Sequence, residues 1–326
     1  MPYLRNRLLR LIPVFFLVTF ASFSLLNLLP GDVADAILGG SDVVDNPAGI
    51  QEARLEIRKE LGLDRPIIER YFDWLGNLLQ GDFGESQIQF VPVWELVVER
   101  LPVTLELLIL SQILALSIAI PAGIYSALKA DQPADRFIGT VVFGIVAMPP
   151  FLLAILFVFI FAVTLRLLPA SGYIPIEEDF FQNMRHFVLP AITIGILEVP
   201  VLLRVLRVDL IATLQEDYIA MAKAKGFSRA YILFNHALRP SSFTLVTMLG
   251  LQFGFLISGT VIIEDMFALP GMGKLILEAI DNRDAMLLQG AVTMIALAYV
   301  SINLMVDILY GFLDPRVGHF GRGRHA

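Results

Sequence analysis

The sequence predicts an all-α integral membrane protein with six transmembrane helices and a small extracytoplasmic domain between helices 1 and 2. The first observation behind this prediction is composition: 56% of the 326 residues are hydrophobic and only 17% are charged, whereas an ordinary soluble domain has about 25% charged residues. The second is a set of six long apolar stretches, and the third is the placement of Lys and Arg between them. The sequence has no cysteine, which excludes disulfides and thiolate chemistry.

Each apolar stretch is long enough to cross a bilayer, which takes roughly 20 residues at a rise of about 1.5 Å each. The predicted spans cover residues 8–29, 101–128, 137–165, 187–210, 243–263 and 290–313. Prolines within or at the ends of these spans are tolerated, because neighbouring helices can satisfy the freed backbone groups. The predicted domains are an N-terminal helix (1–29), an extracytoplasmic loop domain (30–100), a five-helix core (101–313) and a tail (314–326).

The first span begins with features of a secretory signal. Arg5, Arg7 and Arg10 give the N-terminus a positive charge, and residues 34–36 (ADA) resemble a signal-peptide cleavage site. However, the apolar run exceeds the usual signal core of about 7–15 residues. We therefore expect an uncleaved helix whose N-terminus lies in the cytoplasm.

The placement of Lys and Arg gives the orientation of the other segments, since short cytoplasmic loops carry an excess of both. Alternation from a cytoplasmic N-terminus places residues 129–136, the polar segment 211–240 and the tail 314–326 in the cytoplasm. Residues 30–100, 166–186 and 264–289 then lie outside. Both termini are therefore expected in the cytoplasm.

The loop at residues 30–100 is too long for a simple turn. Helical periodicity predicts one short helix at 48–61, stopped by Gly62, and a second at 66–79. The second helix carries an apolar stripe, which consists of Ile67, Tyr71, Trp74 and Leu78. Two interpretations remain open: a cap that packs only on itself, or one that also receives a delivery protein.

The polar segment 211–240 is predicted to form a pair of short helices between the fourth and fifth spans. Gly226 can end the first helix with a positive φ, and Ser228 can cap the second. Basic side chains surround this pair, namely Lys223, Lys225, Arg229 and Arg239. A compact helix–glycine–helix on the cytoplasmic side predicts a docking site for a soluble partner.

Glu198 is the most informative charge within a span, because burying a charge in hydrocarbon is costly. About 15 Å of helix separates it from the outer end of the fourth span, which places it near mid-membrane. One interpretation is a pathway carboxylate that meets a cationic or amine-bearing substrate. The other is a polar lock to a neighbouring helix or a partner subunit. Arg204 and Arg207 are expected to be cytoplasmic anchors of the same helix.

We expect no catalytic residue and no metal site in this chain. Residues 271–274 (GMGK) imitate a phosphate loop, but the glycine spacing is wrong and Leu275 stands where a hydroxyl residue is required. The four histidines are scattered, without a pair at metal-ligand spacing. A turn at the outer mouth of a pathway is the simpler interpretation of this motif.

A series of motifs in fixed order resembles the permease subunits of ATP-binding-cassette importers of the dipeptide, oligopeptide and nickel family, nearly end to end. The motifs are residues 28–32 (LLPGD), 61–66 (LGLDRP), 81–86 (GDFGES), 101–106 (LPVTLE), 267–273 (FALPGMG), 282–284 (NRD), 303–307 (NLMVD) and 314–316 (DPR). Each motif is weak alone, but their order and spacing are specific. The resemblance implies the type I importer permease fold in the inner membrane of a prokaryote.

Residues 217–226 and 236–239 resemble the cytoplasmic coupling motif of this family. That motif begins Glu-Ala-Ala, whereas Ala220, Met221 and Ala222 stand here, so no salt bridge from the missing Glu is expected. The residues that the resemblance assigns to ATPase docking are Asp217, Tyr218, Ala222, Lys225, Gly226, Phe227, Ser228, His236 and Arg239. Those it assigns to the outer loop and periplasmic gate are Phe267, Pro270, Gly271 and Gly273.

The resemblance also implies partners and a mechanism. We expect a second, homologous permease subunit in a heterodimer, two cytoplasmic ATP-binding subunits, an extracytoplasmic solute-binding protein and the lipid membrane, but no nucleic acid. ATP and Mg would be bound by the ATPase subunits, and this chain would hold no cofactor. Peptides are the expected cargo, with nickel chelates or oligosaccharides as the alternative.

Two other classes of protein remain as rivals. A secondary transporter would carry inverted repeats and run without an ATPase, and no convincing internal repeat is present. An intramembrane enzyme would need a nucleophile and a base, or metal ligands, within its spans, and none is evident. An importer permease is therefore the prediction.

Overall fold

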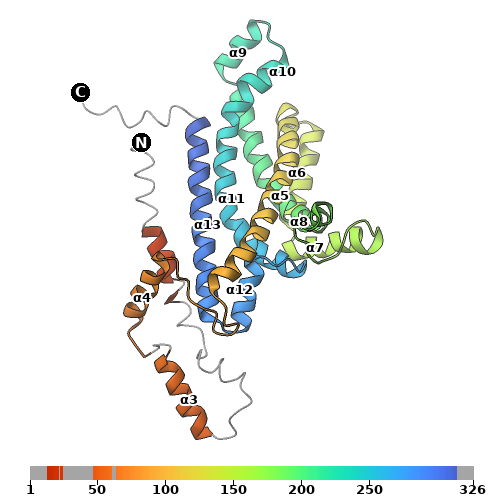
Figure 1. Ribbon diagram of the computed structural model, residues 1–326. Coiled ribbons are helices and arrows are strands. Elements are labelled where there is room, and N and C mark those ends of the chain that lie inside the picture. The colour runs from red at the N-terminus through yellow and green to blue at the C-terminus, as the bar shows by residue number, and fades with distance from the viewer. Residues whose placement is uncertain (1–12, 22, 25–46, 61–63, 314–326) are drawn as a thin grey trace, which may run out of the picture. The chain divides into compact units, whose positions relative to one another are not determined.

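The computed structural model describes residues 13–21, 23–24, 47–60 and 64–313 (Figure 1). The chain divides into two compact units. The first comprises Met1–Val103 and Pro270–Val300, and the second comprises Thr104–Leu269 and Ser301–Ala326. Most described residues are helical, and residues 165–179 form the longest described segment without a helix. The predicted tail 314–326 and half of the predicted first span 8–29 lie outside the described residues.

The first unit contains the two helices predicted in the outer loop. Its helices are α3 (Pro47–Glu60), α4 (Ile67–Leu79), the start of α5 (Val93–Leu128), α12 (Met272–Asp281) and the first part of α13 (Ala285–Leu313). The predicted helices at 48–61 and 66–79 are thus confirmed within one residue at each end. A turn follows α4, with positive φ at Gly81 and Gly84.

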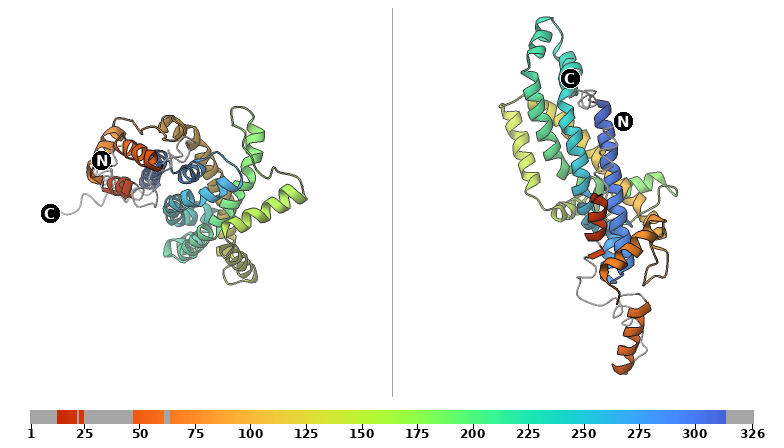
Figure 2. Two further views of the ribbon diagram at one scale, coloured as in Figure 1. Left: turned by 90° about the horizontal axis from the view of Figure 1, so that it is seen from below. Right: turned by 90° about the vertical axis from the view of Figure 1, so that its left-hand side faces the viewer.

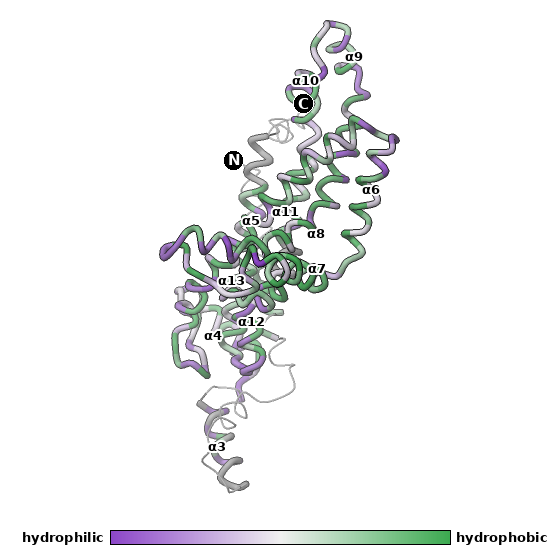
Figure 3. The backbone as a smooth tube through the Cα atoms, turned by 90° about the vertical axis from the view of Figure 1, so that its right-hand side faces the viewer, coloured by the Kyte–Doolittle hydropathy of each residue, from purple (hydrophilic) through white to green (hydrophobic). Residues whose placement is uncertain are grey.

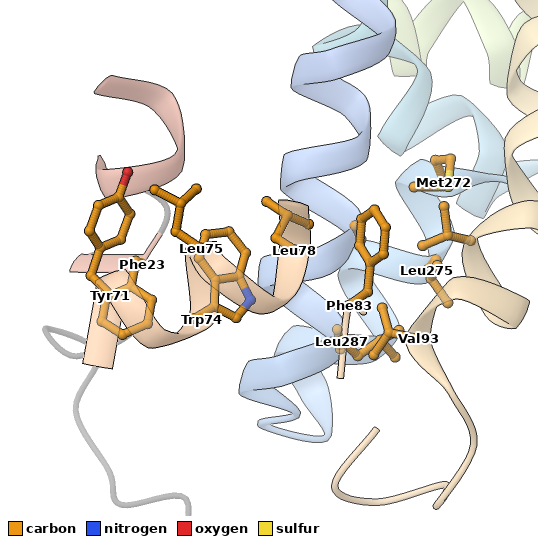
Figure 4. Close-up of a cluster of buried hydrophobic side chains, with 13 residues drawn as sticks. Phe23, Tyr71, Trp74, Leu75, Leu78, Phe83, Val93, Met272, Leu275 and Leu287 are labelled. Atoms are coloured by element: carbon orange, nitrogen blue, oxygen red, sulfur yellow. The ribbon is translucent and has the colours of Figure 1, made fainter. Parts of the chain in front are cut away.

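An aromatic core holds α4 against the helical residues near the N-terminus (Figure 4). Tyr71, Trp74 and Leu78 of the predicted stripe are buried there, whereas Ile67 at the start of α4 is exposed. The rings of Tyr71 and Phe23 lie edge to face with centroids 5.7 Å apart. Such pairs contribute about 0.5–1.5 kcal/mol beyond their buried area. Helix α4 therefore packs in the same hydrophobic cluster as α12.

The second unit is built around one long helix, α8 (Phe180–Leu214). Its other elements are the rest of α5, α6 (Pro133–Val146), α7 (Pro150–Phe157), the π-helix η1 (Val158–Thr164), α9 (Asp217–Ala224), α10 (Arg229–Tyr231), the π-helix η2 (Ile232–Ala237), α11 (Leu238–Met266) and the end of α13. Helix α8 packs against α6, α7 and α11, and lies beside α11 in both views of Figure 2. A cluster of Ala115, Ala119, Leu202 and Leu206 joins α8 to α5.

A glycine allows α8 to approach α5 closely. At Gly195 an added Cβ would lie 2.8 Å from the Ser111 carbonyl oxygen and 3.2 Å from Leu114 Cβ. Small residues at such contacts are typical of helix packing in membranes, because they let backbones approach. Gly195 therefore sets the separation of the two helices.

Three helices of the described residues are long and apolar enough to cross a membrane: α5, α8 and α13 over Ala285–Val306. A fourth span is present if α6 and the α7–η1 pair count as one. The remaining two predicted spans, 8–29 and 243–263, include residues whose placement or side chains are not described. The count of six stays a prediction.

The predicted third span, residues 137–165, is not a continuous helix. Helix α6 ends at Val146, α7 begins at Pro150, and the two directions differ by 103° (Figure 1). Pro149 and Pro150 have no N–H to donate, and the residue before a proline is pushed out of the α region. The two prolines were expected to be tolerated inside a span, but as a consecutive pair they break it.

Candidate functional site

The coupling segment (residues 211–240) leaves the end of α8 and returns as α11. Helix α9 is followed by Gly226 at φ 82°, which any L side chain would find strained. The Gly226 N–H donates to the Lys223 carbonyl at 3.0 Å, and the Phe227 N–H donates to the Ala222 carbonyl at 3.3 Å. Ser228 Oγ then accepts the Tyr231 N–H at 3.3 Å and caps α10. Both local predictions, the glycine stop and the serine cap, are confirmed.

The inner face of the segment is an apolar anchor. Ile219, Ala222, Ile232, Leu233 and Ala237 are buried together with Ala127 of α5 and Leu210 of α8. Complete burial of a side chain such as Ile219 contributes roughly 1.5–3 kcal/mol. The two short helices are therefore fixed to the ends of α5 and α8.

The outer face of the segment exposes large apolar and aromatic side chains. They are Tyr218, Met221, Phe227, Tyr231 and Phe234, which are 41–59% exposed. The Phe227 and Tyr231 rings stack with centroids 5.0 Å apart, and His236 lies 5.5 Å from Tyr231. Aromatic side chains presented rigidly in this way are typical of the central contacts of protein interfaces.

Charged and polar residues border this aromatic surface. Asp217, Lys225, Ser228 and Arg239 are exposed, and Figure 3 shows hydrophilic residues in the loop between α9 and α10. Burial of the ring raises the pKa of the Tyr218 hydroxyl, and the charge of Glu216 adds to the shift. A tyrosine is neutral at physiological pH even without this shift, so Tyr218 offers a hydrogen-bond donor at this surface. Of the predicted docking residues, Ala222 alone is buried, as part of the anchor.

The predicted outer-loop residues fall on both sides of the boundary between the units. In the second unit, Phe267 follows α11 and its carbonyl accepts the Gly172 N–H at 2.9 Å. In the first unit, Gly271 is the N-cap of α12, and Gly273 is buried in its first turn, three residues after the half-buried Pro270. Phe267 thus lies at the end of α11, and Gly271 and Gly273 lie at the start of α12.

A contact between two distant motifs was missed by sequence reasoning. Ser86 Oγ donates to the carboxylate of Asp284, which also accepts the Leu287 N–H at 3.0 Å and so caps α13. Beside them, Gly84 adopts φ 78° and leaves room for Met286. Both motifs contributed to the family resemblance, but no local signal pairs residues 198 positions apart.

Glu198 lies near the midpoint of α8 and is buried within its own unit. Gln112, near the midpoint of α5, and Gln252, near the midpoint of α11, lie against its carboxylate. Glu198 Oε2 and both polar atoms of Gln112 lack a full hydrogen bond to any described residue. Three polar side chains from three helices therefore meet at one level of the bundle. Sequence reasoning found Glu198 but neither glutamine.

Arg207 also has a partner that sequence reasoning missed. Its guanidinium pairs with Asp135 at the start of α6. Arg204, the other predicted anchor, is exposed. Asp135 lies 72 positions before Arg207, and nothing in the sequence indicates that the two residues pair.

Comparison with known proteins identifies the family. The family described as "Binding-protein-dependent transport system inner membrane component" matches residues 119–319, and its N-terminal counterpart matches residues 1–108. The chain belongs to this family. It is the permease component of such a transport system, and the family resemblance seen in the sequence is confirmed.

The permease is similar to named peptide-transport proteins over its whole length. It is 34% identical to the "Di/tripeptide transport system permease protein DppB" of Pseudomonas aeruginosa, with 97% of this chain and 98% of that protein covered. It is 35% identical to the "Glutathione transport system permease protein GsiC" of Escherichia coli K12, with the same coverage. Among solved structures, the inward-facing MetNI methionine ABC transporter matches with a TM-score of 0.56 at 14% identity, over 68% of this chain and 97% of that one. At that identity the likeness is one of fold, and it gives the permease the fold of an ABC importer.

Proposed function

We propose that this permease carries peptides, or small peptide-like solutes, through the membrane as part of an ATP-driven importer. The observation that carries the proposal is the coupling segment, which is anchored by buried apolar residues and presents an exposed aromatic face. Two relatives that match 97% of the chain are named for di/tripeptide and glutathione transport, and they support peptides as the class of cargo. Nickel chelates or oligosaccharides remain the alternative cargo.

The aromatic face fits a groove on a cytoplasmic ATPase. Closure of the ATPase on ATP would displace the segment as a rigid body, since its anchor joins it to α5 and α8. The spans would then tilt and switch the pathway between inward-facing and outward-facing states. ATP and Mg would be held by the ATPase, and this chain would supply no catalytic group.

The assembly that we propose contains a second homologous permease subunit, two ATP-binding subunits and one solute-binding protein. The binding protein would dock outside over residues 30–100 and 264–289, where Ser86 and Asp284 fix two of the motifs to each other. With six spans and both termini in the cytoplasm, residues 30–100 and 264–289 would both lie outside.

Co-purification tests the proposal. The tagged permease, expressed with its neighbouring transport genes, is expected to bring down an ATPase, and peptide uptake by the reconstituted complex is expected to stop with vanadate. Uptake that persists in vanadate would refute an ATP-driven mechanism. Mass spectrometry of the ligand retained by the binding protein separates peptides from nickel chelates and oligosaccharides.

We further propose that Glu198 is a polar lock between helices of this chain, because Gln112 and Gln252 enclose it. Replacement by Gln keeps the shape and hydrogen-bonding groups, so uptake is expected to stay within about twofold. Replacement by Ala removes the polar group that the two glutamines face and leaves space between the helices, so a lower melting temperature in detergent is expected. Selective loss of uptake of peptides with a free amino terminus in Glu198→Gln would instead support the pathway interpretation.

A further inference from the structure

An ion pair between the buried Asp135 and the partly buried Arg207 has no role in the function described so far. Arg207 Nε donates to Asp135 Oδ1 at 2.9 Å, and Arg207 Nη2 donates to Oδ2 at 2.6 Å. The guanidinium therefore engages both carboxylate oxygens, which is the strongest geometry for such a pair. Asp135 is 8% exposed. Water competes weakly at the carboxylate, whereas the Arg207 side chain is 27% exposed.

Two further donors complete the hydrogen bonding of Asp135. Ser126, at the end of α5, donates its hydroxyl to Oδ1, and the Asp131 N–H in the following turn donates to Oδ2 at 2.9 Å. The carboxylate thus joins α5, the turn after it, α6 and α8. Its position in the first turn of α6 is also favourable, because the helix dipole is positive there.

This network lies directly beside the anchor of the coupling segment. Ala127 follows Ser126 in the chain, and Leu210 lies one turn of α8 beyond Arg207; both are buried against Ile219 and Ile232. The polar network and the apolar anchor therefore occupy consecutive turns of the same two helices. Farther along α6, Ile138 and Val142 pack on the cluster between α5 and α8.

We propose that Asp135 and Arg207 are positioning residues for energy coupling: they hold α6 to α8 so that movement of the coupling segment reaches α6. The inference rests on the proposed function, in which an ATPase moves that segment. At its other end α6 leads into the 103° break and the α7–η1 pair. The ion pair would let α6 and α8 move as one body and carry this displacement to the break.

The test uses the assembled complex in lipid nanodiscs and measures peptide transported per ATP hydrolysed. Asp135→Asn keeps the shape but removes the charge, and is expected to lower this ratio about tenfold while ATP hydrolysis continues. Arg207→Lys keeps the charge but loses the two-point contact, so an intermediate ratio is expected. Asp131→Asn makes the same change of charge at an exposed side chain and keeps the main-chain N–H that Asp135 accepts; it serves as the matched control, with a ratio near that of the unmodified permease.

A distance measurement separates positioning from folding. The permease has no cysteine of its own, so spin labels at Thr140→Cys on α6 and Ala230→Cys on the coupling segment report the spacing of these two elements. We expect the spacing to be the same without nucleotide and after vanadate trapping in the unmodified permease, and to differ between these states in Asp135→Asn.

If the single variants assemble poorly, a double variant with the two charges exchanged tests the inference. Asp135→Arg combined with Arg207→Asp is expected to restore assembly and at least part of the transport ratio. An unchanged ratio and unchanged spacing in Asp135→Asn would overturn the inference, as would an assembled reversed pair no better than either single change. Failure of the unmodified complex to transport with ATP would instead count against the proposed function.

Discussion

Replacing Gly226 with Val is expected to abolish coupling while the permease still inserts in the membrane. Gly226 has φ 82°, and a β-branched residue forced into this region costs of order 1–3 kcal/mol. Relief of that strain would unwind the turn between α9 and α10 and reorient the aromatic face. ATP-driven uptake should fall at least about tenfold, measured in proteoliposomes together with the amount of bound ATPase.

Gly226→Asn is the matched control, because Asn tolerates the left-handed region. No described atom lies within 4 Å of an added Cβ at this position, so a larger side chain meets no obstacle within the chain. Near-normal uptake with Asn and loss with Val would assign the effect to backbone conformation. Wild-type uptake with Val would contradict the helix–glycine–helix arrangement as the coupling element.

Replacing Gly195 with Val is expected to prevent stable folding. The new Cβ would lie 2.8 Å from the Ser111 carbonyl oxygen, and this obstacle is backbone that cannot rotate away. Separating α5 from α8 would also disturb the layer of Gln112, Glu198 and Gln252. Overpacking costs typically about 1–3 kcal/mol, so the yield of monodisperse protein in mild detergent should fall sharply.

Gly139→Val provides the comparison for this experiment. Gly139 lies on the exposed side of α6, and no described atom is within 4 Å of an added Cβ. Both substitutions change helix propensity in the same way, so a difference in yield reports the contact with α5. Equal yields of the two variants would show that α5 and α8 do not approach closely at Gly195.

Local features of this permease could be predicted from its sequence. The stop at Gly226, the cap at Ser228 and the limits of α3 and α4 depend on residues within one or two turns, and the structure has them as expected. The apolar stripe of α4 could also be predicted, because its apolar residues recur with the period of a helix. Order and spacing of the motifs were enough to identify the family.

Features that join distant residues were not predictable in the same way. Ser86 with Asp284 and Asp135 with Arg207 are separated by 198 and 72 positions, and nothing local distinguishes a carboxylate that will be paired from one that will be solvated. The glutamines beside Glu198 look like ordinary polar residues of apolar helices. The break in the third span was hidden by the apolar residues on both sides of Pro149 and Pro150.

That break has a consequence for the surrounding bilayer. Helix α6 has 14 residues and so rises about 21 Å, less than the roughly 30 Å of a hydrocarbon core. If α6 and the α7–η1 pair form one span, the chain turns at lipid depth, where two consecutive prolines withhold N–H donors and acyl chains offer none. Peptide oxygens at such a turn need water or another polypeptide to satisfy them. In such a span, residues 147–149 would be the place where water or another polypeptide replaces the acyl chains.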